Sequence, residues 1–341
     1  MSISQSPPRA QSPAESQAQN QSGRQAKYRA RLPQLDGGLF LTDGGIETTL
    51  IFHDGFDLPL FAAFDLMKRR EGRDALRRYF TRYAEIARSN DLGFVFESPT
   101  WRASSDWGQK LGYSEADIAE VNADSITFLA ALREDFEGPD SPMVISGCIG
   151  PRGDGYDPGW MMTAMEAEAY HRKQIRAFAG SEADMITAIT MTYVDEAIGL
   201  ARAALAEGMP VVISFTVETD GRLPSGQSLK EAIEAVDAAT DNGPAYFMIN
   251  CAHPTHFDGT LKPGEAWVGR IKGLRANASC LSHAELDEAE DLDDGNPEEL
   301  GRQIHALHGA MQHITVLGGC CGTDHRHIEA ICRACTTAKA A

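Results

Sequence analysis

From residue 37 onward, short apolar runs rich in β-branched residues alternate with longer stretches whose apolar residues recur every three or four positions. This alternation is typical of βα units, in which helices connect the strands of a parallel sheet. The eight candidate strands are Gly38–Asp43, Leu92–Glu97, Met143–Gly147, Asp184–Thr190, Val211–Val217, Tyr246–Asn250, Val268–Leu274 and His313–Leu317. Eight such units in roughly 300 residues predict an α/β fold of the (β/α)8 TIM-barrel type, formed by residues 36–341 as one domain.

The connections between these strands support the same fold. Helical periodicity is clearest in Asp74–Ser89, Ser114–Leu132, Met162–Gly180, Asp195–Glu207 and Ser228–Thr240. The connection between Asn250 and Val268 is rich in Pro and Gly, and we expect only a short or irregular helix there. Because the active site of such a barrel lies at the carboxyl ends of its strands, functional residues are expected at those ends.

The first 35 residues differ in composition from the rest of the chain. They contain seven Gln and six Ser and no run of large apolar residues, so they cannot bury enough surface to offset the entropy of ordering. We therefore predict a disordered tail over residues 1–35. The tail lacks the apolar segment of a secretory signal, and its basic residues have no accompanying helical apolar stripe of the kind found in organelle-targeting peptides.

Charge, hydropathy and cysteine content limit which classes of partner the protein can bind and which cellular compartment suits it. Lys and Arg number 31 against 49 Asp and Glu, a formal net charge of -18, which is opposite in sign to a nucleic-acid-binding footprint. The longest apolar stretches are far shorter than the roughly 20 residues that cross a bilayer. Seven cysteines, an odd number that includes an adjacent pair, are poor material for a disulfide framework. We expect a cytoplasmic protein that binds neither nucleic acid nor membranes.

Three of the cysteines lie at the ends of only two predicted strands. Cys251 follows the sixth strand, and Cys320 and Cys321 follow the eighth, between glycines. Adjacent side chains of a strand point to opposite sides, so the pair faces one point only if the chain turns, which the glycines permit. Strands six and eight are about 10 Å apart, a gap that inward-leaning side chains can close. Three thiolates are a high-affinity ligand set for zinc, and we predict one zinc ion per chain.

The remaining cysteines and two nearby histidines have simpler interpretations. A buried cysteine is usually a small hydrophobic residue, and this interpretation covers Cys148, Cys280, Cys332 and Cys335. His325 and His327 are near enough in sequence to offer a fourth ligand, but an open fourth position is typical of a catalytic zinc site.

These motifs resemble those of the zinc-dependent homocysteine S-methyltransferases over residues 37–332. The most specific of them are Gly318–Thr323, Asn250–Cys251, the opening Asp43–Gly45 with Thr48 behind it, the Gly-Pro turn in Gly147–Pro151, and Asn277. The resemblance implies a (β/α)8 barrel with zinc bound by Cys251, Cys320 and Cys321, and a substrate site that includes Asp43, Gly44, Thr100 and Asn277. It also implies transfer of a methyl group from a small sulfonium or quaternary-ammonium donor to homocysteine, giving methionine.

The chemistry of such a site can be argued from its residues. A thiol with a pKa of about 8.5 is mostly protonated at neutral pH, and only its thiolate attacks carbon at a useful rate. Zinc lowers that pKa and fixes the sulfur, while three cysteinate ligands keep the sulfur electron-rich. Asp43 is expected to meet the ammonium group of the substrate. The alternative is that Asp43 only forms the turn before Gly44 and Gly45.

Two departures from the family concern the substrate. The family usually has Glu-Thr after the fourth strand, where this chain has Ile189-Thr190, so one carboxylate for the amino group is missing. Arg275 stands where the family usually has Tyr. Together with Arg102 and Arg152, it is predicted either to ring the mouth of the barrel and attract a carboxylate, or to pair with neighbouring acids.

Three functions are compatible with these observations. The first is methyl transfer to homocysteine, and the second is the same chemistry on another thiol. The third is a metal-binding barrel without transfer activity, which the apolar Ile189 makes conceivable. A chain of 341 residues has no room for a cobalamin or folate domain beside the barrel, so we expect a small methyl donor that is used directly.

Overall fold

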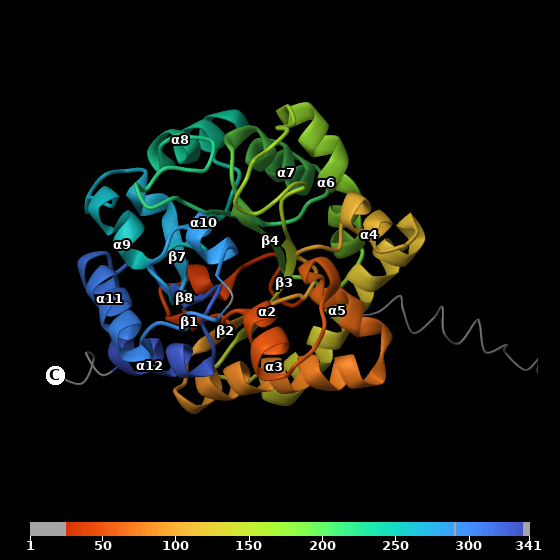
Figure 1. Cartoon of the computed structure of the whole chain (residues 1–341), viewed down its shortest axis with the longest axis horizontal. Coiled ribbons are helices and arrows are strands. Elements are labelled where there is room, and N and C mark those ends of the chain that lie inside the picture. Colours follow the sequence, from red (N-terminus) through yellow and green to blue (C-terminus); the bar gives the residue numbers. More distant parts are fainter. Residues whose placement is uncertain (1–24, 290, 337–341) are drawn as a thin grey trace, which may run out of the picture.

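The computed structural model describes residues 25–289 and 291–336, which form a closed barrel surrounded by helices (Figure 1). Each strand pairs in parallel with the next one in the chain, and β8 closes the barrel on β1. The strands are β1 (Phe40–Leu41), β2 (Gly93–Glu97), β3 (Met143–Ile149), β4 (Met185–Met191), β5 (Val211–Phe215), β6 (Tyr246–Asn250), β7 (Ile271–Ala276) and β8 (Val316–Gly319). The predicted (β/α)8 fold is confirmed. Within the described part of the chain, no helix has both the length and the apolar character needed to cross a membrane.

Helices connect the strands on the outside of the barrel. They are α2 (Ile46–Thr48), α3 (Arg70–Ser89), α4 (Ser105–Lys110), α5 (Glu115–Phe136), α6 (Ala164–Ala179), α7 (Val194–Ala206), α8 (Leu229–Thr240), α9 (Pro254–Phe257), α10 (His283–Asp287), α11 (Pro297–Ala310) and α12 (His325–Thr336). Four begin with a capping box, in which a Ser or Thr and an acid three residues later exchange hydrogen bonds with the backbone; the caps are Ser114, Thr163, Ser228 and Ser282. As expected, the connection after β6 holds only the short α9 and 3-10 turns.

The largest differences from the predicted strands are at β7 and β8, which each start three residues later than predicted. The apolar residues before β7 form the 3-10 turn Val268–Arg270, so β7 begins at Ile271. Before β8, the Ile314 N–H donates to the Met311 carbonyl oxygen at 2.9 Å, which closes a turn and delays the strand. Val268 and Ile314 are fully buried although they lie in turns, because burial alone does not distinguish a strand from a tight turn that packs on the core.

The interior of the barrel changes from apolar to polar along the strands. A buried apolar cluster fills the amino-terminal end: Leu32, Phe40, Val95, Val144, Met185, Val212, Tyr246, Met248 and Val316. Two residues further along their strands, and therefore on the same face, lie Glu97, Ser146 and Thr187. A further two residues along β3 and β4 lie Cys148 and Ile189. The groups capable of chemistry thus gather toward the carboxyl ends of the strands.

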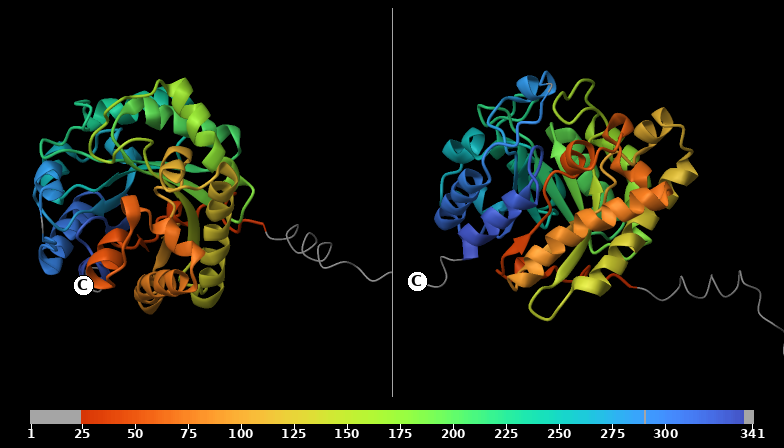
Figure 2. Two further views of the ribbon diagram at one scale, coloured as in Figure 1. Left: turned by 45° about the vertical axis from the view of Figure 1, so that its right-hand side comes forward. Right: turned by 60° about the horizontal axis from the view of Figure 1, so that its bottom comes forward.

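The prediction of a disordered tail over residues 1–35 is wrong for residues 25–35, which pack across the amino-terminal end of the barrel. Leu32 and Gln34 are only 4% and 1% exposed. The Tyr28 backbone N–H donates to Asp184 Oδ1 at 2.7 Å, and Arg29 donates to backbone carbonyl oxygens after α6. In the right-hand view of Figure 2, this red segment lies at the lower end of the barrel. Residues 1–24 of the predicted tail lie outside the described residues.

Candidate metal centre

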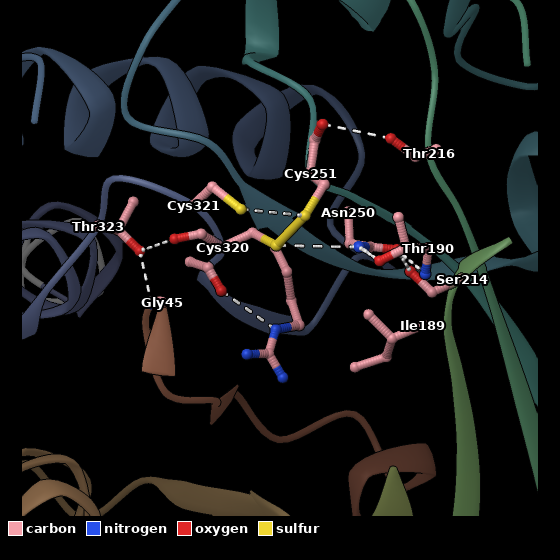
Figure 3. Close-up of a disulfide and its surroundings, with 12 residues drawn as sticks. Gly45, Ile189, Thr190, Ser214, Thr216, Asn250, Cys251, Cys320, Cys321 and Thr323 are labelled. Atoms are coloured by element: carbon pink, nitrogen blue, oxygen red, sulfur yellow. Dashed lines mark hydrogen bonds between the residues drawn. A yellow bond between two sulfur atoms is a disulfide. The ribbon is translucent and has the colours of Figure 1, made fainter. Parts of the chain in front are cut away.

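The three cysteines predicted as ligands meet at the carboxyl ends of β6 and β8 (Figure 3). Their Sγ atoms all lie within 4.8 Å of one another. Among residues 25–289 and 291–336, they form the one group of His, Cys, Asp or Glu side chains arranged to hold a metal ion. Cys251 and Cys320 are joined by a disulfide, and Cys321 Sγ lies 3.7 Å from Cys251 Sγ. Cys321 is exposed, so the cluster is accessible from solvent.

Local backbone geometry explains how these sulfurs come together. Cys251 has a φ of 51°, a left-handed conformation that takes it out of the strand direction. A Cβ at Gly318 would lie 1.9 Å from Thr42 Oγ1, and a Cβ at Gly319 would lie 2.1 Å from Thr323 Oγ1. Glycine is therefore required at Gly318 for β8 to approach the residue after β1, and at Gly319 for the following turn to bring Thr323 back against the strand. This close approach delivers the following cysteine pair to the rim.

The spacing between the Cys251 and Cys321 sulfurs suits a shared metal ion. In tetrahedral coordination with Zn–S bonds of about 2.3 Å, two sulfurs are about 3.8 Å apart. The Cys251 and Cys321 sulfurs, at 3.7 Å, match this spacing. The sequence did not predict this disulfide, which forms because thiols close enough to share a metal are also close enough to oxidise. The disulfide and a three-thiolate site use the same atoms, so metal binding requires the reduced chain.

The other cysteines and the candidate fourth ligand lie away from the sulfur cluster. Cys148, Cys332 and Cys335 are buried as expected, whereas Cys280 is exposed and so does not fit its interpretation as a buried hydrophobic residue. His327 is fully buried and makes a 2.8 Å hydrogen bond to the Asp294 carbonyl oxygen. It also contacts Asp324, at 3.2 Å, so its ring is held by the chain.

Two aromatic residues beside the sulfurs were missed by the sequence analysis. The Tyr156 hydroxyl lies 3.2 Å from Cys321 Sγ, and its ring stacks on that of His283 with centroids 4.0 Å apart. His283 Nε2 donates to the Cys251 carbonyl oxygen at 2.7 Å. Tyr156 comes from the loop after β3 and His283 begins α10, after β7, and no local motif marks either residue. Only the closure of the barrel places them together.

Asn250 ties the ends of three strands together beneath the cluster. Its Oδ1 accepts hydrogen bonds from Ser214 Oγ at 2.6 Å and the Thr190 N–H at 2.9 Å, and its Nδ2 donates to Thr190 Oγ1 at 2.9 Å. Ile189, next to Thr190, is 7% exposed and lies across from the cysteines in Figure 3. This position therefore presents an apolar side chain to the site, as expected from the sequence.

Asp43 and Arg275 form a buried ion pair after β1 and on β7. Arg275 Nη2 donates to Asp43 Oδ1 at 2.6 Å, and the Tyr79 hydroxyl donates to Asp43 Oδ2 at 2.9 Å. Arg275 Nε donates to the carbonyl oxygen of Gly319, directly before the cysteine pair, at 3.1 Å. Burial lowers the pKa of Arg275, but the negative charges of Asp43 and, to a smaller extent, Glu97, Tyr79 and Cys148 together more than offset this and raise the pKa overall. The guanidinium is therefore charged at every physiological pH.

Glu97, at the end of β2, is a further buried charge that the sequence analysis noted only as a strand end. Burial raises the pKa of its carboxyl to about 7, against opposing effects of Arg275 and of hydrogen bonds from the Ser146 and Thr187 hydroxyls. Glu97 Oε2, Arg275 Nη1 and Asn277 Oδ1 are buried atoms without a hydrogen-bond partner. Buried polar atoms are normally hydrogen-bonded, so these three are the atoms with which the polar groups of a bound ligand could pair.

The other predicted substrate residues are buried near the same strand ends. The Gly44 carbonyl oxygen accepts a hydrogen bond from the Tyr79 hydroxyl at 2.9 Å. The Thr100 hydroxyl donates to the Cys148 carbonyl oxygen at 2.7 Å and so links the ends of β2 and β3. Asn277, 2% exposed, keeps its unpartnered oxygen. A direct contact of Gly44, Thr100 or Asn277 with substrate stays a prediction.

The three arginines predicted to ring the mouth all pair with acids. Arg275 pairs with Asp43, as described. Arg152 Nε donates to Asp106 Oδ2 at 2.7 Å. Arg102, 5% exposed, stacks between Trp101 and Trp107 and lies 3.7 Å from Asp154. The second of the two alternatives, pairing with neighbouring acids, is therefore the one observed.

Comparison with known proteins agrees with the resemblance. Residues 40–335 match the family model described as homocysteine S-methyltransferase. Homocysteine S-methyltransferase 4 of Zea mays is 25% identical over 323 residues, covering 87% of this chain and 90% of its own. Homocysteine S-methyltransferase 1 of Brassica oleracea var. italica is 23% identical over 331 residues, covering 87% and 93%.

Solved structures show the same fold. The oxidised form of the homocysteine methyltransferase MmuM from Escherichia coli has a TM-score of 0.69 and 18% identity, covering 89% of this chain and 99% of its own. The metallated form of the same protein has a TM-score of 0.66 at 16% identity, with 90% and 99% covered. With a family match that extends over nearly the whole barrel, this chain belongs to the homocysteine S-methyltransferase family.

Proposed function

We propose that this methyltransferase uses zinc held by Cys251, Cys320 and Cys321 to transfer a methyl group from a small sulfonium or quaternary-ammonium donor to homocysteine, giving methionine. The observation that carries the proposal is the meeting of three cysteine sulfurs within 4.8 Å at the carboxyl end of the barrel. Three soft ligands in this arrangement favour one zinc ion per chain. The family match supports methyl transfer to homocysteine.

When bound, zinc lowers the pKa of the acceptor thiol and fixes its sulfur. The thiolate sulfur then attacks the methyl carbon, and a new S–C bond forms as the donor's C–S or C–N bond breaks. The donor leaves as a neutral sulfide or amine, and the proton of the thiol goes to solvent. A cationic donor is favoured because its positive charge disappears as the bond breaks.

The chain's own residues hold the ligating cysteines in place. The Cys251 carbonyl oxygen accepts hydrogen bonds from His283 and, at 3.2 Å, from Thr216 Oγ1. The Cys320 carbonyl oxygen accepts one from Thr323 Oγ1 at 2.7 Å. Such contacts behind the ligands fix their orientation, which metal affinity depends on.

The proposal includes the compartment and the partners. A small-molecule thiol and a methyl donor are the partners, with neither nucleic acid nor membrane. The acidic net charge of -18 supports the exclusion of nucleic acid. A cytoplasmic location is favoured because the metal site needs reduced cysteines, which a reducing compartment maintains.

The first test measures zinc in protein purified under reducing conditions. We expect one zinc ion per chain in the wild type, loss of activity in Cys320→Ser, and a melting temperature lowered only by the loss of bound metal. Cys280→Ser is the matched control, because Cys280 is exposed and outside the sulfur cluster. Full zinc content in a triple Cys251→Ser, Cys320→Ser, Cys321→Ser variant would exclude this metal site.

The second test identifies the donor. The reduced, zinc-loaded enzyme is assayed for methyl transfer to homocysteine from betaine, S-methylmethionine, S-adenosylmethionine and dimethylsulfoniopropionate. We expect activity with at least one of these cationic donors. Zinc binding without methyl transfer from any of them would favour the alternative of a metal-binding barrel without transfer activity.

A further inference from the structure

The geometry points to an acceptor that is recognised through a carboxylate, by Arg275, and not through an ammonium group, by Asp43. The substrate class is then thiols that carry a carboxylate, for which an α-amino group is not required. This inference rests on the proposed function and specifies its acceptor.

Asp43 is already engaged by the chain. Both carboxylate oxygens accept hydrogen bonds, one from Arg275 Nη2 at 2.6 Å and the other from the Tyr79 hydroxyl at 2.9 Å. The residue is 2% exposed. The carboxylate could accept further hydrogen bonds, but its charge is already neutralised by Arg275, so an ammonium group bound there would be a second cation beside a buried guanidinium.

In contrast to Asp43, Arg275 has a side-chain nitrogen that makes no hydrogen bond. Its Nε and Nη2 bind the chain, whereas Nη1 is buried without a hydrogen-bond partner. The Arg275 carbonyl oxygen accepts from the Cys251 N–H at 3.1 Å, and Nε binds the carbonyl oxygen of Gly319. Arg275 is thus on β7, the strand between β6 and β8, which carry the cysteines at their ends. A substrate carboxylate is the group that best completes a buried guanidinium.

Neither position 189 nor Glu97 offers an ammonium group a better binding site than Asp43. Ile189 replaces the carboxylate expected on β4. Glu97 has one free oxygen, but its hydrogen bonds go to the Ser146 and Thr187 hydroxyls. These two residues precede Cys148 and Ile189 by two positions, which places that layer about 7 Å deeper along the strands. Glu97 is also close enough to Arg275 for each group to shift the pKa of the other, so its charge acts on the proposed anchor itself.

The test compares three thiols that differ only in their charged groups: homocysteine, 4-mercaptobutanoate without the amino group, and 3-mercaptopropylamine without the carboxylate. Binding to the reduced, zinc-loaded wild type is measured by calorimetry with no donor present. We expect homocysteine and 4-mercaptobutanoate to bind within about threefold of each other. The amine should bind roughly ten- to a hundredfold more weakly, the effect of losing a charge-assisted hydrogen bond. Homocysteine binding tenfold or more above 4-mercaptobutanoate would overturn the inference.

Variants of the Asp43–Arg275 ion pair give a second test, the relative affinity for the three thiols. A misfolded variant would lose all three affinities together and would not change their order. Arg275→Gln removes the anchor and frees Asp43, so the preference should reverse toward 3-mercaptopropylamine. Asp43→Asn should leave the ratio of the affinities for homocysteine and 4-mercaptobutanoate unchanged. If Asp43 instead binds the ammonium group, this variant should weaken the binding of homocysteine selectively. Arg152→Gln is the matched control, since Arg152 pairs with Asp106 away from the sulfurs. Equal weakening of all three thiols by Arg275→Gln would contradict carboxylate recognition.

A carboxylate on the donor is the other possible occupant of Arg275, and a separate arm of the experiment distinguishes it. Dimethylsulfoniopropionate and trimethylsulfonium are compared for binding to wild type and to Arg275→Gln, without thiol. We expect Arg275→Gln to affect them equally. A selective loss of dimethylsulfoniopropionate, with thiol binding unchanged, would assign Arg275 to the donor instead. If no thiol binds the zinc protein, the proposed function itself fails, which is a different result from a preference for homocysteine.

Discussion

The barrel buries an arginine–aspartate pair toward each of its ends, and the two pairs differ in how completely the chain satisfies them. In the lower pair, Arg133 Nη1 donates to Asp184 Oδ2 at 2.8 Å. Asp184 also accepts from the N–H groups of Tyr28, at 2.7 Å, and Ile145, at 2.9 Å. In the upper pair, Arg275 binds Asp43, but Arg275 Nη1 is a buried donor without a partner.

This difference separates a structural pair from one that is available for function. The lower pair joins α5, the start of β4 and the amino-terminal segment, and neither Arg133 nor Asp184 has a buried side-chain atom without a partner. The upper pair lies among the strand ends that carry the cysteines, and its Arg275 Nη1 is the donor that we propose a ligand completes. Substitutions in the lower pair should therefore change stability, and substitutions in the upper pair should chiefly change binding.

The largest expected effect is on the lower pair. Asp184→Asn keeps the shape of the side chain but leaves the Arg133 guanidinium buried without a counter-charge. Breaking a buried ion pair in this way costs about 3–5 kcal/mol in the free energy of unfolding. Denaturant unfolding measures it, with Asp135→Asn as control, because the Arg77–Asp135 pair is about half exposed and should contribute little. A loss below about 1 kcal/mol for Asp184→Asn would show that the two pairs do not differ as argued.

Sequence reasoning predicted one half of the candidate site far better than the other. The cysteine cluster was predictable because glycines, cysteines and strand ends form a contiguous motif after β8, and one further cysteine ends β6. The Asp43–Arg275 pair joins residues 232 positions apart, and it forms only because barrel closure brings β7 and β8 beside β1. No local spacing indicates that pairing. The sequence therefore predicted that Asp43 meets the substrate ammonium or forms a turn, with pairing to acids as one role for Arg275, but it could not identify Asp43 as the acid.

An intermediate effect concerns the pH dependence of stability at the upper end. The pKa of the Glu97 carboxyl is raised from 4.5 to about 7, chiefly by burial. Between these values the folded chain holds a proton that the unfolded chain has released. The contribution of Glu97 to stability is therefore present below about pH 4.5 and is lost as the pH rises through about 7.

Glu97→Gln removes this dependence. Relative to the wild type, the variant should gain about 3 kcal/mol in the free energy of unfolding between pH 4.5 and pH 8. The measurement is denaturant unfolding of both proteins across that range, fully loaded with zinc, so that shared pH effects cancel in the difference. A difference that does not change with pH would mean that Glu97 is ionised in the folded chain throughout, with a partner for its free oxygen.

The smallest expected effect tests the segment that covers the lower end. The prediction of disorder rested on Gln and Ser content averaged over 35 residues, which conceals the few residues that pack. Arg29 is one of them: its guanidinium donates to the carbonyl oxygens of Ala179 at 3.0 Å and of Ser181 and Ala183 at 2.8 Å. Arg31, two positions later, instead pairs with Asp36 and has a side chain that is 80% exposed.

These two arginines form a matched pair for the final prediction. Arg29→Ala should lower the free energy of unfolding by about 1–2 kcal/mol, because it removes charge-assisted hydrogen bonds to carbonyl oxygens after α6. Arg31→Ala should change it by less than about 0.5 kcal/mol. Methyl-transfer activity below the melting temperature should be unchanged in both, since the segment is at the end of the barrel opposite the cysteines. Equal stability of the two variants would restore the original view of this segment as a tail that contributes nothing to the fold.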